Sequence, residues 1–253
     1  MPPLSSKTIP LVSTCDAALA VFARTPLAGR CKTRLIPLLG AQGAAEFQRA
    51  LLIDTLRKVA PLGGKLALYL MMTDSGFDFT EAGERKFSEL SQFVFLQQCE
   101  GDLGKRLESA FHLLLRRHRR ALIIGTDSPQ LNRQILRRAI EELRWCDAVL
   151  GSCPDGGYYL IGLRRGAGKP LGKGLLRNIR WGSARAFDDT LRNLITAGLA
   201  CSLLEPLEDV DRPEDFMRLK RQMIRDTRTR RRAPMIWQFL RKGSSGSGRT
   251  APR

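Results

Sequence analysis

Residues 17–40 read AALAVFARTPLAGRCKTRLIPLLG, and this stretch indicates the fold class. Its first seven residues are all apolar, as expected for a strand that is buried on both faces of a sheet. A turn-rich loop with Pro26 and Gly29 follows, and a helix-like segment comes after it. The loop carries four basic residues: Arg24, Arg30, Lys32 and Arg34. A strand, a loop and a helix in this order form the first half of a β-α-β unit, which predicts a parallel sheet.

The rest of the chain continues the same alternation of strand-like and helix-like segments. Strands are predicted at 17–23, 65–72, 93–98, 121–127, 147–152, 157–163 and 200–205. Helices are predicted at 43–60, 102–119, 133–145, 183–198 and 212–226. This order predicts an α/β fold with a mostly parallel, mixed sheet between two helical layers, an α/β/α sandwich. Since no linker interrupts the pattern, we expect one domain over residues 14–226.

The positive charge of the chain is concentrated near its C-terminal end. The formal net charge is +17. Twelve Lys or Arg residues and one acid, Asp226, follow from position 218, which gives 12 − 1 = +11 for this part. We therefore predict that residues 227–253 form a basic, largely disordered tail that favours solubility or non-specific contacts. Specific nucleic-acid binding is not expected, because no aromatic stacking surface accompanies the charge.

The length of the apolar runs and the spacing of the cysteines limit the class of protein. No apolar run approaches the ~20 residues that cross a bilayer, and the proline-broken N-terminus is a poor signal peptide. We therefore expect a cytoplasmic protein without membrane partners, and its oligomeric state is not predicted. The six cysteines are scattered without a C-x-x-C pair, so neither a disulfide framework nor a Cys/His zinc site is expected.

The loop after the first strand has the composition of a phosphate site. Gly29 can adopt positive φ and let the main chain approach a ligand. Backbone N–H groups together with Arg24, Lys32 and Arg34 would bind phosphates. The loop is neither a Walker A sequence nor a G-x-G-x-x-G motif. The alternative is an exposed basic loop without a ligand.

Carboxylates follow three other predicted strands. Asp127 in TDSP is a candidate Mg²⁺ ligand, or else Asp127 or Ser128 caps the next helix. Asp209 and Asp211 precede the last predicted helix, with the same capping alternative. Ligands of parallel sheets bind beyond the carboxyl ends of the strands. Because carboxylates gathered among phosphates repel one another, they imply a bound metal.

The segment CPDGGYYLIGL (153–163) is a further candidate. Asp155, Gly156 and Gly157 form a predicted tight turn, which either belongs to a plain hairpin or lets a ligand lie against the main chain. Tyr158 and Tyr159 point to opposite faces of the predicted strand, so at most one of them faces the site.

Six segments together resemble a known family: VFARTPLAGRCKTRLIPLLG (21–40), GDLGKRL (101–107), GTDSPQL (125–131), DAVLGSCPDGGYYLIGL (147–163), WGS (181–183) and DVDRPEDF (209–216). They resemble the glycosyltransferase-like branch of the nucleotide-diphospho-sugar transferase superfamily, which has the GT-A fold. That branch is related to the guanylyltransferases that act on molybdenum cofactor and on phospholactate.

The resemblance implies a nucleotide site, an acceptor site and a metal. Nucleotide-binding residues would be Arg24, Gly29, Lys32, Thr33, Arg34, Gln98, Asp102 and Gly104, with Lys32, Arg34 and Asp127 catalytic. Acceptor-binding residues would be Asp155, Gly156, Gly157, Tyr158 and Trp181. Asp127 and Asp211 would bind Mg²⁺ or Mn²⁺.

The chain departs from the family pattern at four positions. Arg24 replaces a lysine, Ser152 a proline and Arg212 a threonine, and Gly182 displaces a hydroxyl that follows the tryptophan. We expect these changes to alter local charge, the stiffness of a turn and the acceptor side of the site.

Three functions remain open from the sequence. The first is nucleotidyl transfer from a nucleoside triphosphate to a small phosphorylated acceptor, with Lys32 and Arg34 holding the leaving pyrophosphate. The second is glycosyl transfer from a nucleotide sugar. The third is a non-catalytic nucleotide- or RNA-binding role. No general acid or base is evident, since His112 and His118 are predicted on a helix surface.

Overall fold

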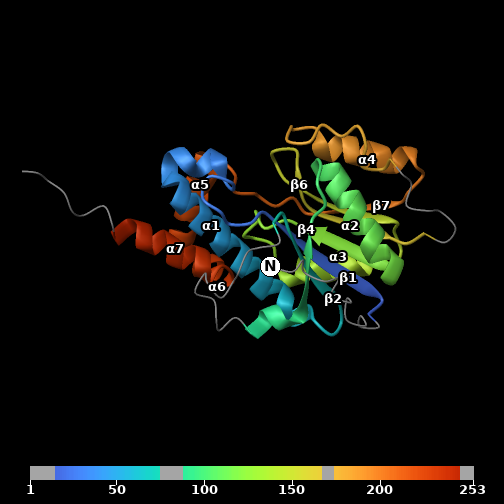
Figure 1. Ribbon diagram of the computed structural model, residues 1–253, viewed down its shortest axis with the longest axis horizontal. Coiled ribbons are helices and arrows are strands. Elements are labelled where there is room, and N and C mark those ends of the chain that lie inside the picture. The colour runs from blue at the N-terminus through green and yellow to red at the C-terminus, as the bar shows by residue number, and fades with distance from the viewer. Residues whose placement is uncertain (1–14, 75–87, 167–173, 246–253) are drawn as a thin grey trace, which may run out of the picture.

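A computed structural model describes residues 15–74, 88–166 and 174–245 (Figure 1). Its sheet has seven strands in the order β3-β2-β1-β4-β6-β5-β7. Only β6 runs antiparallel to its two neighbours, β4 and β5, so the predicted mixed, mostly parallel sheet is confirmed. The strands are β1 (Ala17–Ala23), β2 (Ala67–Met72), β3 (Phe93–Gln97), β4 (Arg120–Ile124), β5 (Ala148–Ser152), β6 (Tyr158–Arg164) and β7 (Cys201–Leu204).

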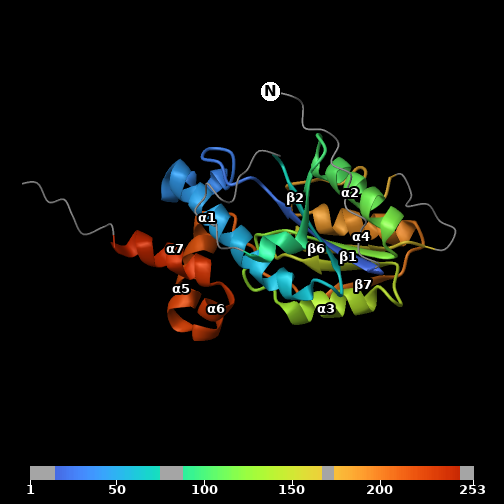
Figure 2. The ribbon, with the colours of Figure 1, turned by 60° about the horizontal axis from the view of Figure 1, so that its bottom comes forward.

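Helices cover both faces of this sheet. They are α1 (Ile36–Val59), α2 (Leu103–Arg117), α3 (Arg133–Glu142), α4 (Ala186–Thr196), α5 (Pro213–Arg225), α6 (Thr227–Arg232) and α7 (Pro234–Ser245), with short 3₁₀ turns η1 (Thr33–Leu35), η2 (Ala60–Leu62) and η3 (Ser88–Gln92). One core contains residues of α1 and α3, and the other contains residues of α2 and α4. Figure 2 shows α2 and α4 on one side of the sheet and α3 on the other. The predicted α/β/α sandwich is therefore confirmed.

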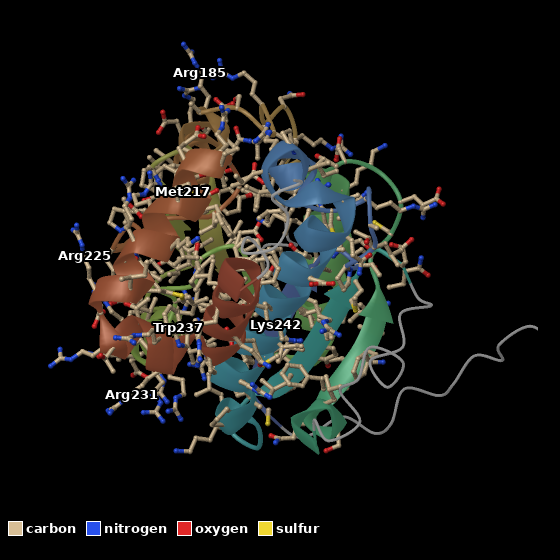
Figure 3. The ribbon with its side chains drawn as sticks, turned by 90° about the vertical axis from the view of Figure 1, so that its left-hand side faces the viewer. Arg185, Met217, Arg225, Arg231, Trp237 and Lys242 are labelled. Atoms are coloured by element: carbon tan, nitrogen blue, oxygen red, sulfur yellow. The ribbon has the colours of Figure 1, made fainter. Side chains whose placement is uncertain are left out.

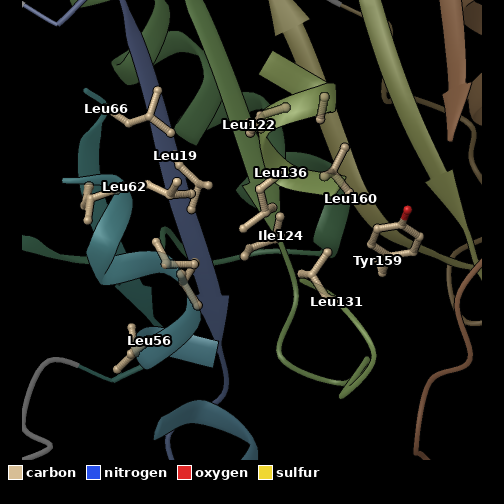
Figure 4. Packing of buried hydrophobic residues seen from close by; sticks show 14 of the residues in the cluster. Leu19, Leu56, Leu62, Leu66, Leu122, Ile124, Leu131, Leu136, Tyr159 and Leu160 are labelled. Atoms are coloured by element: carbon tan, nitrogen blue, oxygen red, sulfur yellow. The ribbon is translucent and has the colours of Figure 1, made fainter. Parts of the chain in front are cut away.

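The first strand shows why its sequence is apolar throughout. Leu19 and Val21 contribute to the core of α1 and α3, whereas Ala18 and Ala20 contribute to the core on the opposite face. Figure 4 shows Leu19 and Leu122 of the sheet among the side chains of the first of these cores. Strand β1 is thus buried on both faces, as the run of apolar residues predicts.

Helix α1 begins earlier than residue 43, the start expected from hydrophobic spacing. It starts at Ile36 and contains a kink at Gly40, which has φ 71° and ψ 166°. Glycine adopts this conformation at little steric cost, whereas other residues rarely do. The kink redirects the chain from the basic loop onto the sheet.

The C-terminal segment corrects a prediction. Residues 227–232 and 234–245 are helical, so the predicted disordered tail is wrong for this part. Residue 14 and residues 246–253 lie outside the described residues. Ala233, Ile236 and Leu240 are buried in a third core with residues of α1 and α5. Figure 3 shows α7 beside α1, while Arg225 and Arg231 point outward. The buried apolar residues recur at helical spacing on one side of α7, but the many arginines nearby obscure this pattern in the sequence.

His118 also differs from expectation. His112 is exposed, as predicted, but His118 is buried. Its Nδ1 donates to the Cys15 carbonyl at 2.7 Å, and its Nε2 lies 3.0 Å from the Tyr69 hydroxyl. His118 therefore ties the end of α2 to the sheet, because both ring nitrogens have partners.

The six cysteines are all free, as the scattered spacing predicts. Within the described part of the chain, no helix is long and apolar enough to cross a bilayer.

Candidate active site at the carboxyl edge of the sheet

The strand order places the candidate site between β1 and β4. From β1 the chain proceeds to β2 and β3 on one side, and β4 then lies on the other side of β1. Such a reversal opens a crevice at the carboxyl ends of the two strands, where ligands of α/β folds bind. The loop after β1 and the segment after β4 both start at this edge. Segments after β5 and β7 reach the same edge, because these strands run in the same direction.

The basic loop is tied to the ends of β1 and β2. Thr25 is buried, and its backbone N–H donates to the hydroxyl of Thr73 at 3.1 Å. The N–H of Arg30 closes a turn on the Leu27 carbonyl at 3.0 Å. Gly29 in this turn has φ 77°, as the sequence predicts. The loop is thus anchored at its start and exposed at its tip.

Lys32 is the centre of the candidate site. Its side chain is only 3% exposed, and its ammonium donates to the Val210 carbonyl at 2.6 Å. The same nitrogen lies 2.9 Å from Asp127 Oδ1 and 3.9 Å from Asp211 Oδ1. Its backbone adopts the left-handed conformation, φ 45° and ψ 41°, which is uncommon for a residue with a side chain. One buried cation therefore joins the segments after β1, β4 and β7.

Asp127 is held from the side of β4. The Thr126 hydroxyl donates to Asp127 Oδ1 at 3.1 Å, and Gln48 of α1 donates to Thr126 at 3.2 Å. The side chain of Asp127 is 46% exposed, so the carboxylate is also reachable from solvent. Asn132 caps α3 by accepting from the N–H groups of residues 134 and 135. The capping alternative for Asp127 and Ser128 is therefore wrong.

Asp211 is held by two cations. Arg34 Nη1 lies 2.6 Å from Asp211 Oδ2, and the Lys32 ammonium approaches the other oxygen. Asp215 accepts from the N–H of Arg212 at 2.9 Å, which completes the N-terminus of α5. Asp211 is thus not the cap of this helix. Lys32, Arg34, Asp127 and Asp211 form one cluster, hereafter the Lys32 cluster.

A second group of side chains lies at the same edge. Ligand atoms of Cys153, Asp155 and Asp209 lie within 4.8 Å of one another. Burial, and then the negative charge of Asp155, raises the pKa of Asp209 to about 6, with Asp127 adding to the effect. Burial, followed by Asp209 and Asp155, raises the pKa of the Cys153 thiol to about 12. Cys153 was not predicted at this edge, and Asp209 was not predicted as a ligand, because no metal-binding spacing in the sequence connects the two residues.

The turn between β5 and β6 is closely packed. Gly156 has φ 86°, and a Cβ at this position would collide with the backbone of Ala184. The carbonyl of Gly156 accepts from the N–H of Phe187 at 2.8 Å. Asp155 Oδ1 accepts from the N–H of Gly157 at 2.8 Å. The predicted hairpin is confirmed, and the packing requires a glycine at position 156.

Tyr158 and Tyr159 face opposite sides of the sheet, as predicted. Tyr158 packs edge-to-face on Trp181, with ring centroids 6.1 Å apart, on the side of α2 and α4. Burial raises the pKa of Tyr158 well above its ordinary value. The Tyr159 hydroxyl donates to the Glu205 carbonyl at 3.0 Å on the other side. Tyr158 and Trp181 therefore remain together on one face of the predicted acceptor region.

The remaining residues predicted for the nucleotide site form contacts with nearby parts of the chain. The Gln98 amide donates to the Met71 carbonyl at 2.8 Å and the Ala23 carbonyl at 3.3 Å, which joins the ends of β1 and β2. Asp102 caps α2 by accepting from the N–H of residue 105 at 2.8 Å. A Cβ on Gly104 would lie 3.0 Å from Trp181 Nε1, so the predicted base side borders the acceptor region. Arg24 and Thr33 are exposed.

The comparisons with known proteins agree with this fold. The family model described as "Uncharacterized protein conserved in bacteria (DUF2064)" matches residues 57–183, which is 183 − 57 + 1 = 127 of the 253 residues. The match includes Asp127, Asp155 and Trp181, whereas the basic loop and Asp211 lie outside it. None of the curated proteins matches the chain.

Two solved structures have the same fold. A protein from Desulfovibrio desulfuricans G20 that is assigned as a nucleotide-diphospho-sugar transferase is 28% identical, with a TM-score of 0.78 over 91% of this chain and 96% of that chain. A cytidylyltransferase from Leptospira borgpetersenii serovar Hardjo-bovis is 12% identical, with a TM-score of 0.53 over 94% of this chain and 100% of that chain. The fold is that of the nucleotide-diphospho-sugar transferase superfamily.

Proposed function

The chain belongs to the DUF2064 family, and we propose that it is a metal-dependent nucleotidyltransferase. It would transfer a nucleotidyl group from a nucleoside triphosphate to a small phosphorylated acceptor and release pyrophosphate. The observation that carries this proposal is the Lys32 cluster. Two cations and two carboxylates from three different segments meet at the switch point of the sheet, the position at which ligands of α/β folds bind.

The two cations are suited to phosphate oxygens. Lys32 is a buried point charge with a fixed position, and Arg34 is an exposed guanidinium whose side chain is 54% exposed. Both already bind carboxylate oxygens, and a triphosphate offers the same kind of acceptor with more charge. In this proposal they hold the departing pyrophosphate, and backbone N–H groups at the exposed tip of the loop would add neutral donors.

The two carboxylates fit a divalent ion. Asp127 and Asp211 share one ammonium in the structure, and their side chains are 46% and 34% exposed. Carboxylate oxygens are the ligands that Mg²⁺ and Mn²⁺ prefer. We assign Asp127 and Asp211 as the ligands. A bound divalent ion would supply charge neutralisation at the reacting phosphate, while Lys32 keeps the two carboxylates aligned.

The acceptor and the base would occupy the flanks of this cluster. The turn of Asp155, Gly156 and Gly157, with Tyr158 and Trp181 behind it, forms the acceptor side of the proposal. Gln98, Asp102 and Gly104 form the nucleotide side. Because the Gln98 amide and the Asp102 carboxylate already bind backbone groups, they would shape the site mainly by positioning the main chain.

Glycosyl transfer is the second candidate function. It is favoured by the assignment of the Desulfovibrio desulfuricans relative as a nucleotide-diphospho-sugar transferase. The same residues would then bind the diphosphate of a nucleotide sugar. We prefer nucleotidyl transfer because Lys32 and Arg34 together provide more positive charge than a departing diphosphate requires once a metal is bound.

Product analysis distinguishes the two reactions. The protein is incubated with each nucleoside triphosphate, Mg²⁺ and sugar 1-phosphates or phosphorylated hydroxy acids, and pyrophosphate is measured. A second series uses nucleotide sugars, and free nucleoside diphosphate is measured. We expect pyrophosphate, which Asp127→Asn should abolish. Asp16→Asn, which alters an exposed aspartate before β1, should leave the rate unchanged. Nucleoside diphosphate without pyrophosphate would reverse the order of the two functions.

A further inference from the structure

We propose that Cys153, Asp155 and Asp209 form a binding site for a divalent transition-metal ion such as Zn²⁺. This site would be additional to the Mg²⁺ position of the proposed function. Two of the residues lie in the turn after β5, and the third lies in the segment after β7. Their ligand atoms lie within 4.8 Å of one another.

The spacing of the three ligand atoms is close to that of a metal centre. Zinc binds sulfur at about 2.3 Å and carboxylate oxygen at about 2.0–2.2 Å, so neighbouring ligands of a tetrahedral ion are about 3.5 Å apart. The three ligand atoms, within 4.8 Å of one another, would have to move closer to bind one ion. Three protein ligands leave a fourth position for water or for another ligand.

The backbone holds both segments in place. The N–H of Cys153 donates to the Gly157 carbonyl at 2.9 Å, and the N–H of Gly156 donates to the Cys153 carbonyl at 3.0 Å. On the other segment, the N–H of Val210 donates to the Asp127 carbonyl at 2.9 Å, which fixes the residue after Asp209. The ligand set therefore rests on two anchored turns.

Among the described residues, the two carboxylates of this group have no cation of their own. In the part of the chain that the structure describes, neither Asp155 nor Asp209 forms a salt bridge, in contrast to Asp211 with its two cations. The carboxylate oxygens of Asp155 and Asp209 lie within 4.8 Å of each other, so two like charges are close together. A divalent ion would remove this repulsion.

A second, independent feature points to the same position. Ser128 is only 5% exposed, and its hydroxyl has no hydrogen-bond partner within the described residues. It lies beside the Cys153 thiol. A buried hydroxyl without a partner is unfavourable, and a metal-bound water or the metal itself would provide one.

The thiol selects the class of metal. Thiolate sulfur favours Zn²⁺ and other transition ions over Mg²⁺, which takes oxygen ligands. When the metal–sulfur bond forms, the thiol releases its proton to solvent. The proposed site and the Lys32 cluster would therefore bind different ions.

Cobalt provides a direct test, because thiolate–Co²⁺ bonds give charge-transfer absorption in the near ultraviolet. The metal-free full-length protein is titrated with Co²⁺. We expect one Co²⁺ per chain with this absorption, which Zn²⁺ displaces and Mg²⁺ does not. Cys153→Ser should lose the absorption, and Cys201→Ser, which changes a half-buried cysteine on β7, should retain it.

A second variant covers the case in which Cys153→Ser fails to fold. Asp209→Asn should weaken Co²⁺ binding by about tenfold or more while the absorption at saturation remains. The proposal is overturned if the wild-type protein shows no such absorption, if Cys153→Ser retains it, or if Asp209→Asn binds Co²⁺ as tightly as wild type. Pyrophosphate release with Mg²⁺ alone is independent of these readouts, so the two proposals fail separately.

Discussion

Lys32 combines burial, a strained backbone and three oxygen neighbours in one residue. The left-handed conformation costs about 1–2 kcal/mol for a residue with a Cβ, and such outliers are concentrated at functional sites. The sequence predicts a phosphate-binding lysine in this loop. It does not predict the conformation of Lys32, because Gly29 is the residue of the loop suited to positive φ.

Lys32→Ala should weaken nucleotide binding strongly. A charge-assisted hydrogen bond contributes about 1.5–3 kcal/mol, so the dissociation constant for a nucleoside triphosphate with Mg²⁺ should rise about 10- to 100-fold. Calorimetric titration measures this change. Arg30→Ala is the matched control, since Arg30 is a cation of the same loop with a 73% exposed side chain. Equal affinities for both variants would show that Lys32 does not contribute to nucleotide binding.

Gly156→Ala should destabilise the fold more than a positive φ alone explains. A methyl group at Gly156 meets the backbone of Ala184, which cannot rotate away. Gly198 also has positive φ, 69°, but open space around its Cβ position. Gly198→Ala should therefore cost about 1 kcal/mol of unfolding free energy, and Gly156→Ala should cost clearly more in urea unfolding. Equal costs would show that the close approach is relieved by small movements.

Some features of the candidate site can be identified only in the folded chain. Asp211 and Lys32 are identified by motif, and the structure brings them together, while their roles stay predictions. Cys153 and Asp209 come from different loops, and only the pairing of β5 with β7 brings them together. A Cys-Pro-Asp segment carries no metal spacing of its own.

At the scale of elements, the hydrophobic periodicity locates the strands and helices of the sandwich well. Buried parallel strands read as continuous apolar runs, and α2 to α5 show one-sided patterns. The sequence prediction does not include helices α6 and α7, because the density of basic residues there indicates a disordered tail. Five arginines at 225–232 precede the apolar residues of the next turns and make the whole segment strongly basic.

Ile236→Ala tests whether α7 is part of the folded unit. Ile236 is fully buried in the third core, where Phe47 also packs. Its truncation should lower the unfolding free energy by about 2–5 kcal/mol. Gln238→Ala changes an exposed residue of the same helix and should have little effect. If both variants unfold at the same urea concentration as wild type, α7 contributes no stability.

Asp54 gives the docking of α7 a dependence on pH. Its carboxylate accepts from the N–H groups of Met235 and Ile236 at 3.1 and 3.0 Å. Burial raises the pKa of Asp54 from 3.8 to about 6, although these hydrogen bonds act in the opposite direction. The native state therefore holds the proton more tightly than the unfolded state. Its contribution to stability is complete below about pH 4 and is lost as pH rises through about 6.

Asp54→Asn removes this titration. The stability of wild type relative to the variant should fall by about 2 kcal/mol between pH 4 and pH 7, because the folded-state pKa lies about two above the unfolded one. Urea unfolding of both proteins at several pH values measures the change. A constant difference over this range would mean that Asp54 has the same pKa in both states.

At the scale of the whole molecule, the strand order explains why distant segments share one site. Residues 24–34, 125–131 and 205–211 are far apart in sequence, but β1, β4, β5 and β7 all end at one edge. The alternation of strands and helices predicts this common edge. It does not predict that β4 pairs with β1 or that β6 inserts antiparallel between β4 and β5, because these pairings depend on contacts across the sheet.

The central claim is that a divalent ion and the phosphates of a nucleotide meet at the Lys32 cluster. The most direct test compares nucleoside triphosphate affinity with and without Mg²⁺ in wild type and in Asp127→Asn. We predict that Mg²⁺ tightens binding to the wild-type protein and that the variant loses this enhancement while it retains the metal-free affinity. An equal enhancement by Mg²⁺ in both proteins would contradict the account.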